Sequence, residues 1–193
     1  GNDVVVRDPQ DPEKEVARFA FPRQEGRESL CLADYFRSAE DAEGAEIAAA
    51  EAAEGAEGRE GAVAAPARPI DYVGFLIVSV SDSLLQESEA KMKEGEYTEG
   101  YYLHGFGVRL AEAAAEWTHR RMREEWGIDE GRGLRYAWGY PACPDHTQHA
   151  ILYRLLPARE KLRMELTEAG ALVPELSTAA IVVHHPEAKY FSA

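Results

Sequence analysis

The chain has 193 residues, and 45% of them are hydrophobic, so it can bury a core of ordinary size. Its formal net charge of −14 argues against duplex nucleic acid and anionic membrane surfaces as partners, because both polyanions recruit lysine and arginine. The longest apolar run, residues 73–80, is too short to span a membrane, and the first residues lack a charged-then-apolar signal region.

The cysteine content favours a reducing compartment. Cys31 and Cys143 are the two cysteines of the chain, which are too few for a disulfide framework. We therefore expect both to be free thiols in a cytoplasmic protein.

Two short strands are predicted first, at residues 4–6 and 17–21, because these apolar runs flank a polar stretch that contains two prolines. Residues 30–36 form a short apolar element. From about residue 39 to residue 66 the chain is alanine, glutamate and glycine with almost nothing bulky, which predicts a disordered surface insertion. The alternative there is a solvated helix around residues 47–53, which alanine and glutamate would permit.

A strand and two helices are predicted next. Residues 70–80 read as a buried strand, and the spacing of Ser83 and Gln86 predicts a capping box that opens a helix ending near Lys93. A longer helix follows the 95–100 break and stops near Gly127. Its apolar residues recur at steps of three and four, so we expect one buried stripe, formed by Leu103, Phe106, Leu110, Ala113 and Trp117.

The last elements are a third helix and a further strand. Asp145 and Gln148 repeat the capping-box spacing, which predicts a helix over residues 146–156 that Pro157 ends. Residues 179–183 are typical of a buried strand. Strands and helices are mixed without regular βαβ alternation, so the sequence predicts an α+β fold with a mainly antiparallel sheet and long helices.

Chemistry-bearing residues are densest in residues 134–146, which hold a cation, three aromatic residues, a glycine and two prolines. The guanidinium of Arg135 suits a carboxylate, because it donates paired hydrogen bonds. The aromatic rings suit a flat base or an onium cation. Composition alone favours the plainer interpretation, a proline-rich connection with packed rings.

A metal site in this region is a weaker hypothesis. A thiolate and imidazoles could reach one ion from Cys143, His146 and His149. Pro144 separates the thiol from the helix and no fourth ligand is evident, so we predict no metal. His184 and His185 point to opposite faces of a strand and cannot act together.

The motif run resembles a known family. Leu134-Arg135 followed by Gly139-Tyr140-Pro141-Ala142-Cys143-Pro144-Asp145-His146-Thr147 is similar to the signature of the C-terminal activation domain of cobalamin-dependent methionine synthase. Further segments resemble that family in the same order, at residues 31–36, 71–74, 109–116 and 185–191. The similarity covers nearly everything except the Ala/Glu-rich insertion.

The resemblance implies a domain that binds S-adenosylmethionine and closes over the corrin of an adjacent cobalamin domain. There, an electron donor such as flavodoxin would reduce cob(II)alamin, and S-adenosylmethionine would remethylate it to methylcobalamin. The chain would thus be part of a methyltransferase and would not make methionine by itself. The family domain begins before the equivalent of Gly1 and extends beyond that of Ala193, so we expect residues 1–193 to be a fragment or a short variant.

The same resemblance assigns site residues. Arg135 would bind the amino-acid carboxylate, Ala137 would offer backbone contacts, and Tyr140 would line the pocket. Tyr190 and Phe191 stand where the family has a binding aromatic pair, and the phenylalanine removes one hydroxyl. All of these would position the ligand, because methyl transfer needs alignment and removal of water more than proton transfer.

Two acidic residues complete the predicted site. Glu112 takes the place of a helical acid near the ligand, and Asp129 that of a second acid, with Glu130 as the alternative. On spacing alone, Glu112 is equally a solvated helix residue paired with neighbours at helical spacing, namely Glu116, His119 and Arg123.

Other functions fit the sequence less well. The main alternative is a non-catalytic S-adenosylmethionine sensor or a module that docks to a corrinoid protein, since either would share the pocket. A free-standing Rossmann-type methyltransferase should carry a glycine-rich turn directly after its first strand, and none occurs.

Overall fold

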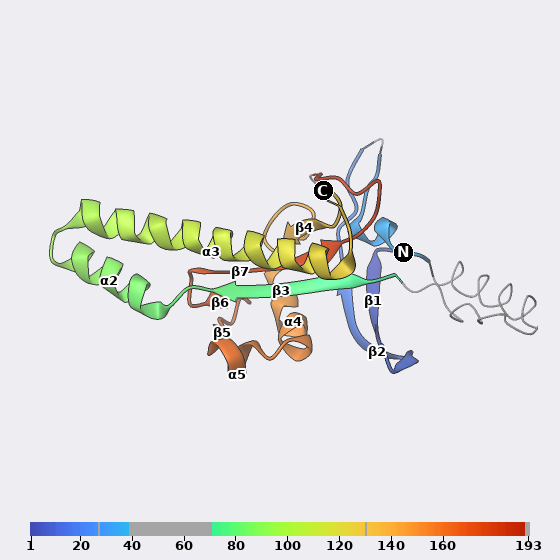
Figure 1. The fold of residues 1–193 in the computed structure, drawn as a ribbon, viewed down its shortest axis with the longest axis horizontal. Helices are drawn as coiled ribbons and strands as arrows, with labels where there is room; N and C mark the ends of the chain where they lie inside the picture. Colours follow the sequence, from blue (N-terminus) through green and yellow to red (C-terminus); the bar gives the residue numbers. More distant parts are fainter. Residues whose placement is uncertain (27, 39–70, 130, 192–193) are drawn as a thin grey trace, which may run out of the picture.

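The computed structural model describes residues 1–26, 28–38, 71–129 and 131–191. Figure 1 shows a long helical hairpin lying along a small sheet, with a β-hairpin at one end of the molecule. The predicted insertion at residues 39–66 and the alternative acid Glu130 lie outside the described residues. No helix of the described ranges is both long enough and apolar enough to cross a membrane.

The elements follow one another in mixed order. They are β1 (Asp3–Asp8), β2 (Asp11–Ala20), η1 (Leu32–Tyr35), β3 (Val73–Ser79), α2 (Asp82–Lys93), α3 (Tyr97–Trp126), β4 (Leu134–Ala137), η2 (His146–Gln148), α4 (His149–Leu155), α5 (Ala158–Leu162), β5 (Glu165–Leu166), β6 (Leu172–Val173) and β7 (Ser177–Val183). All strand pairs are antiparallel, which confirms the predicted α+β class.

The central sheet has the strand order β3-β7-β4, with β7 in the middle. Residues of β7 alternate between two cores: Ile181 and Val183 face the larger core, while Ala180 and Val182 face the core beneath α3. Both faces of β7 are covered, so its run of buried apolar residues is continuous rather than alternating. The strand predicted at residues 179–183 is confirmed.

The α2–α3 hairpin runs antiparallel, and its ends are set by local chemistry. Ser81 is the N-cap of α2 and accepts a hydrogen bond from the Ser83 amide at 3.3 Å, so the predicted capping box at Ser83 and Gln86 is wrong by two residues. Helix α3 stops at Gly127, which adopts a left-handed conformation with φ of 65°. The predicted end of the long helix is confirmed.

The predicted buried stripe of α3 is wrong. Phe106, Leu110 and Trp117 are 59%, 42% and 65% exposed, and Ala113 is exposed as well. The face that packs on the sheet and on α2 instead carries small residues and one histidine, namely Gly107, Ala111, Ala115 and His119. A Cβ atom on Gly107 would lie 2.5 Å from Leu176 Cδ1, so the helix approaches too closely for large side chains. Close approach, not hydrophobicity, selects the buried face.

The opposite face of the sheet is covered by the β1–β2 hairpin and α4, which share the larger core. Asp145 caps this region by accepting a hydrogen bond from the Thr147 amide at 2.9 Å. The predicted reciprocal bond from Gln148 is absent, because its side chain bonds the Ala20 carbonyl and Trp138. The first turn is consequently a short 3-10 helix, and the α-helix begins only at His149.

Candidate functional site

The motif run forms β4 and a tight turn after it. Tyr140 and Cys143 form a β-bridge in which the Cys143 amide donates to the Tyr140 carbonyl at 2.9 Å. Gly139 closes the turn with φ of 91°, and a Cβ atom there would collide with the His146 ring, so glycine is required. The turn is therefore rigid and holds the Tyr140 side chain, which is 64% exposed, at its tip.

Trp138 anchors this turn to the core. Its ring is 6% exposed and packs against Phe19, Phe75 and His149. Its indole nitrogen donates to the Gln148 side chain at 3.3 Å. Trp138 directly follows β4, whose residues Arg135 and Ala137 are held by pairing with β7.

The buried Cys143 and His149 beside the turn each contact a backbone carbonyl. The Cys143 thiol donates to the Ala137 carbonyl at 2.9 Å, and burial raises its pKa to about 12. Burial also lowers the pKa of His149, whose Nδ1 lies 2.7 Å from the Gly170 carbonyl. In the described part of the chain no group of three or more histidine, cysteine, aspartate or glutamate residues could hold an ion.

The segment that follows β7 reaches back to β4 and forms another wall of the site. The Tyr136 hydroxyl donates to the Lys189 carbonyl at 2.7 Å. The ring of Tyr136 packs against Tyr190 and Phe191, with centroids 5.4 Å and 6.4 Å away. Burial raises the pKa of Tyr136, so its hydroxyl remains protonated and stays a donor.

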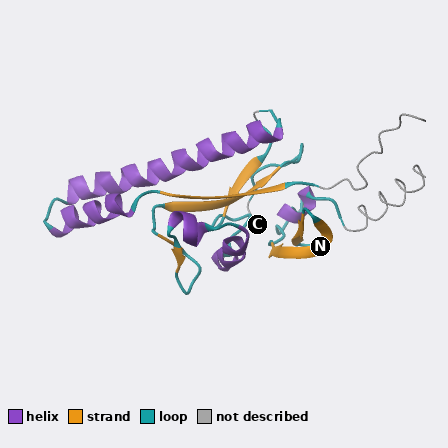
Figure 2. Cartoon of the chain, turned by 60° about the horizontal axis from the view of Figure 1, so that its bottom comes forward, coloured by secondary structure: helices purple, strands orange, loops and turns teal. Residues whose placement is uncertain are grey.

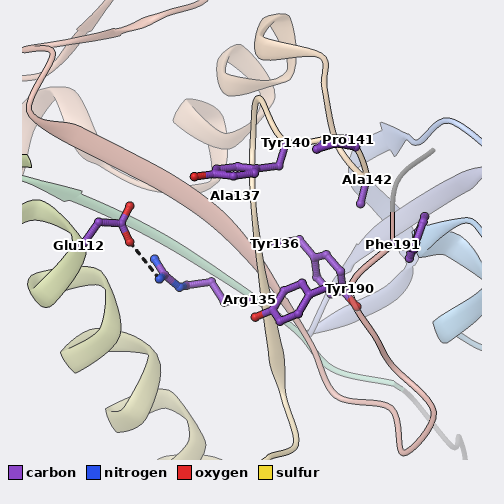
Figure 3. Close-up of a pocket in the computed structure, with 9 residues that line it drawn as sticks. All are labelled: Glu112, Arg135, Tyr136, Ala137, Tyr140, Pro141, Ala142, Tyr190 and Phe191. Atoms are coloured by element: carbon purple, nitrogen blue, oxygen red, sulfur yellow. Dashed lines mark hydrogen bonds and ion pairs between the residues drawn. The ribbon is translucent and has the colours of Figure 1, made fainter.

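These elements enclose a pocket of about 610 Å³ between α3, β4, the turn and the C-terminal segment. Figure 3 shows the side chains of Arg135 and Glu112 pointing toward each other, with the ring of Tyr140 drawn apart from this pair. Arg135 Nη2 lies 3.3 Å from Glu112 Oε2. The pocket is lined by Glu112, Arg135, Tyr136, Ala137, Tyr140, Pro141, Ala142, Tyr190 and Phe191.

The Glu112–Arg135 pair joins two elements that are far apart in sequence. Arg135 is mostly buried at 16% side-chain exposure, whereas Glu112 is 49% exposed. Such a pair offers one positive and one negative group side by side at the wall of a cavity that is otherwise aromatic and apolar. A ligand that carries both charges can therefore be held at both ends of its zwitterion.

Most of the residues predicted for the site come together here. Six of the seven line the pocket; the exception is Asp129, which is exposed in the loop after α3 and accepts the Arg132 amide through its carbonyl. The alternative for Glu112, an ion pair with residues on its own helix, is not what the structure shows, because its partner is Arg135 on β4. Tyr136, Pro141 and Ala142 also line the pocket, and none of the three was among the predicted binding residues.

The model of one protein family, described as the vitamin B12-dependent methionine synthase activation domain, matches residues 1–193. The chain belongs to this family. The predicted resemblance, which rested on residues 134–147 and four shorter segments, is confirmed.

Curated relatives of this activation-domain chain are much longer proteins. It is 35% identical over 212 residues to the methionine synthase of Mycobacterium tuberculosis, strain ATCC 25618 / H37Rv, and 34% identical over 211 residues to that of Mycobacterium leprae, strain TN. These matches cover 100% and 99% of the chain, but the chain spans 16% of each relative.

A solved structure supports the fold of the activation domain. The MetH reactivation domain bound to AdoHcy superposes with a TM-score of 0.75 at 24% sequence identity. The match covers 100% of this chain and 57% of the solved one. The mixed helical and antiparallel architecture is therefore that of a known reactivation domain.

Proposed function

We propose that the pocket binds S-adenosylmethionine, and that the chain serves the reductive remethylation of cob(II)alamin to methylcobalamin within a methionine synthase. The observation that carries the proposal is the Glu112–Arg135 pair in an aromatic pocket, in a chain of the activation-domain family. The similar MetH reactivation domain was solved with AdoHcy, the form that S-adenosylmethionine takes after it has lost its methyl group.

The charged groups match the two ends of an amino acid. The guanidinium of Arg135 would donate paired hydrogen bonds to the ligand carboxylate, and Glu112 would accept from its ammonium group. On binding, the ion pair between Glu112 and Arg135 would be exchanged for two ion pairs with the ligand, one to its carboxylate and one to its ammonium group. Each buried charge would therefore keep an opposite charge beside it. The volume of about 610 Å³ lies within the range of cavities that take ligands of this size.

The aromatic side chains match the rest of the molecule. Tyr140 and Tyr190, which are 64% and 67% exposed, offer ring faces for the adenine and for the sulfonium cation. Ala137 lines the same pocket from β4 and would contribute backbone groups. Phe191 would add apolar surface but no hydroxyl.

The chemistry needs positioning rather than acid–base catalysis. When bound, S-adenosylmethionine supplies a methyl cation equivalent to a strong nucleophile, and no proton moves in that step. The residues of this chain would hold the ligand and exclude water. The Cys143 thiol stays protonated because burial raises its pKa to about 12, so it would not compete for the methyl group.

The partners belong to the same proposal. Cobalamin would be carried by an adjacent domain of methionine synthase, and flavodoxin or a similar donor would supply the electron in the cytoplasm. The acidic chain, with a net charge of −14, would not seek nucleic acid.

Calorimetric titration with S-adenosylmethionine tests the pocket. We expect Arg135→Ala to weaken binding by about tenfold to about a hundredfold, since hydrogen bonds to a charged group are lost. Arg109→Ala is the matched control, because Arg109 lies one turn from Glu112 on α3 but outside the pocket lining. Equal binding by Arg135→Ala and the parent chain would contradict the assignment.

A second ligand sharpens the test. Decarboxylated S-adenosylmethionine lacks the group that Arg135 is proposed to hold. The parent chain should prefer the intact ligand, and Arg135→Ala should lose most of that preference. A variant that keeps the full preference would show that the carboxylate is recognised elsewhere.

Methyl transfer separates this function from a sensor. The chain and S-adenosylmethionine are added to a cobalamin-loaded domain of methionine synthase under reducing conditions, and the visible spectrum of the corrin is followed. We expect methylcobalamin to form faster than without the chain. Tight ligand binding with no gain in methylation would favour the sensor or docking alternative.

A further inference from the structure

The segment that ends the described chain reaches the pocket without the support of regular secondary structure. Residues 184–191 form neither helix nor strand, yet they carry Tyr190 and Phe191, which line the pocket. Tyr190 is largely exposed, so burial of its own ring does not fix it. Its position in the pocket therefore depends on how the backbone of this segment is held. Figure 2 shows the compact part of the fold against which the segment lies.

Two tyrosine hydroxyls bind the same residue of the segment. The Tyr136 hydroxyl donates to the Lys189 carbonyl at 2.7 Å, and the Tyr35 hydroxyl accepts from the Lys189 amide at 3.4 Å. These partners lie 53 and 154 positions from Lys189 in the sequence. Tyr35 and Tyr136, hereafter the tyrosine clamp, thus satisfy both backbone polar groups of the residue that directly precedes Tyr190.

Both hydroxyls belong to buried, rigid parts of the fold. Tyr136 lies within β4, where it pairs with Ile181 of β7. Tyr35 ends η1, and Asp34 holds that turn by accepting from the Cys31 amide at 2.9 Å. The two rings are buried in the larger core. Side chains fixed in this way present their hydroxyls at defined points, as a supporting shell for a binding site requires.

The rings of the clamp also contact the two pocket residues. The centroid of the Phe191 ring lies 6.5 Å from that of Tyr35 and 6.4 Å from that of Tyr136. Tyr190 packs on Tyr136 with centroids 5.4 Å apart, and these two rings lie side by side in Figure 3. The clamp therefore meets the segment at its backbone and at both side chains that face the pocket.

The other polar attachment of Lys189 is weaker. Its ammonium group lies 2.6 Å from Glu28, but the two side chains are 51% and 59% exposed. An ion pair in water at this exposure contributes little, because both groups are well solvated when apart. The buried hydroxyls are therefore the stronger of the polar contacts that hold Lys189.

We propose that Tyr35 and Tyr136 are positioning residues for the ligand, which set through the Lys189 peptide where Tyr190 and Phe191 stand in the pocket. The inference rests on the proposed binding of S-adenosylmethionine there. Tyr35 does not line the pocket, so its effect on the ligand is transmitted through the backbone. Neither hydroxyl takes part in methyl transfer.

Tryptic cleavage of the Lys189–Tyr190 bond tests the hold of the clamp without any ligand. The protease must draw the backbone of Lys189 into its own active site, which the two hydrogen bonds oppose, so the rate follows the population of the freed segment. We expect Tyr35→Phe and Tyr136→Phe each to accelerate loss of residues 190–193 by about threefold to about tenfold, the effect of one lost hydrogen bond. Mass spectrometry at short digestion times measures this rate.

Tyr153→Phe is the matched control. The Tyr153 hydroxyl also donates to a backbone carbonyl, that of Glu165 at 3.3 Å, but Tyr153 is not in the pocket lining. We expect this variant to lose residues 190–193 at the rate of the parent chain. Equal acceleration by Tyr153→Phe, with all variants folded by circular dichroism, would overturn the clamp.

Calorimetric titration with S-adenosylmethionine tests the positioning role. We expect Tyr35→Phe to weaken binding by about threefold to about tenfold although Tyr35 does not line the pocket. In a chain that already carries Tyr190→Ala, the same change should have a much smaller effect, because part of the wall that Tyr35 positions is gone. Full additivity of the two changes would reduce Tyr35 to a structural role and overturn the proposal.

The two measurements fail in different ways. Cleavage at the parent rate in both Tyr35→Phe and Tyr136→Phe would overturn the clamp whether or not the ligand binds. Accelerated cleavage with parent-like affinity would overturn the positioning role alone. Accelerated cleavage in a chain whose parent form does not bind S-adenosylmethionine would support the hold of the clamp on the segment and overturn the proposed function.

Discussion

The two faces of α3 carry opposite kinds of side chain. The face on the sheet is built from glycine and alanine, with a buried histidine, while the outer face carries exposed aromatic rings. The usual preference of large apolar residues for buried positions would place them on the face that packs on the sheet. Close approach at Gly107 favours small residues on the inner face there, whereas near the end of the helix Trp126 packs against Gly74 of β3, so the local distance decides which residues fit.

The largest expected effect comes from adding bulk to the inner face. Ala115 is completely buried, so Ala115→Leu should destabilise the fold by about 1 to 3 kcal/mol through overpacking. Ala113→Leu makes the same change on the outer face and should shift stability by no more than about 0.5 kcal/mol. Urea unfolding of dilute protein measures both. Equal effects would erase the contrast between the faces.

The next effect is a pH dependence on the inner face. Burial lowers the pKa of His119, whose Nε2 donates to the Gly133 carbonyl. A lowered pKa in the folded state means that the stability contribution is present above the unfolded pKa of about 6.5 and is lost as pH falls below it. We expect the free energy of unfolding to decrease between about pH 6.5 and pH 5, before the carboxylates titrate.

His119→Gln checks this assignment, because it removes one of the two histidines whose pKa burial lowers; the slope in that window should become shallower, and His149 accounts for the part that remains. Arg121→Ala is the control on the same helix: Arg121 forms an exposed ion pair with Glu125, and its loss leaves every histidine in place. A slope that is unchanged in His119→Gln would assign the acid sensitivity to other groups.

The smallest effect is expected on the outer face. Phe106→Ser removes a ring that is 59% exposed, so the free energy of unfolding of the chain should change by about 0.5 kcal/mol or less. Thermal unfolding at micromolar concentration tests this. A loss of several kcal/mol would mean that the ring is packed within one chain.

The pocket was largely predictable, and the reason is local. Arg135, Ala137 and Tyr140 lie within six residues of one another, on β4 and the turn that Gly139 closes. From the residues alone only Arg135 and Tyr140 were expected to face a ligand. The contributions of Ala137, Glu112, Tyr190 and Phe191 came from the family resemblance, since no spacing rule assigns them to the site. The role of Tyr136 could not be predicted, because its contact with Lys189 joins residues more than fifty positions apart.

Some elements of the fold were likewise predictable from local sequence, and others were not. Strand β7 was predictable from its β-branched run, and the end of α3 from Gly127. The buried face of α3 was not, because helical periodicity marks two apolar stripes and only the packing distance chooses between them. The cap at Ser81 was missed because two serines lie two residues apart and either can begin the helix.

The wall formed by Tyr190 and Phe191 has a thermodynamic consequence. Residues 184–191 form neither helix nor strand, and their attachment includes the Tyr136 hydroxyl, an ion pair of Lys189 with Glu28 at 2.6 Å, and packing of His185 on Tyr35. Any ligand of the pocket meets a complete wall only in molecules whose segment is docked. The apparent affinity is thus the intrinsic affinity multiplied by the fraction of molecules in which residues 184–191 are docked. A measurement of ligand affinity therefore reports how ordered this segment is, which most spectroscopic probes of folding would not detect.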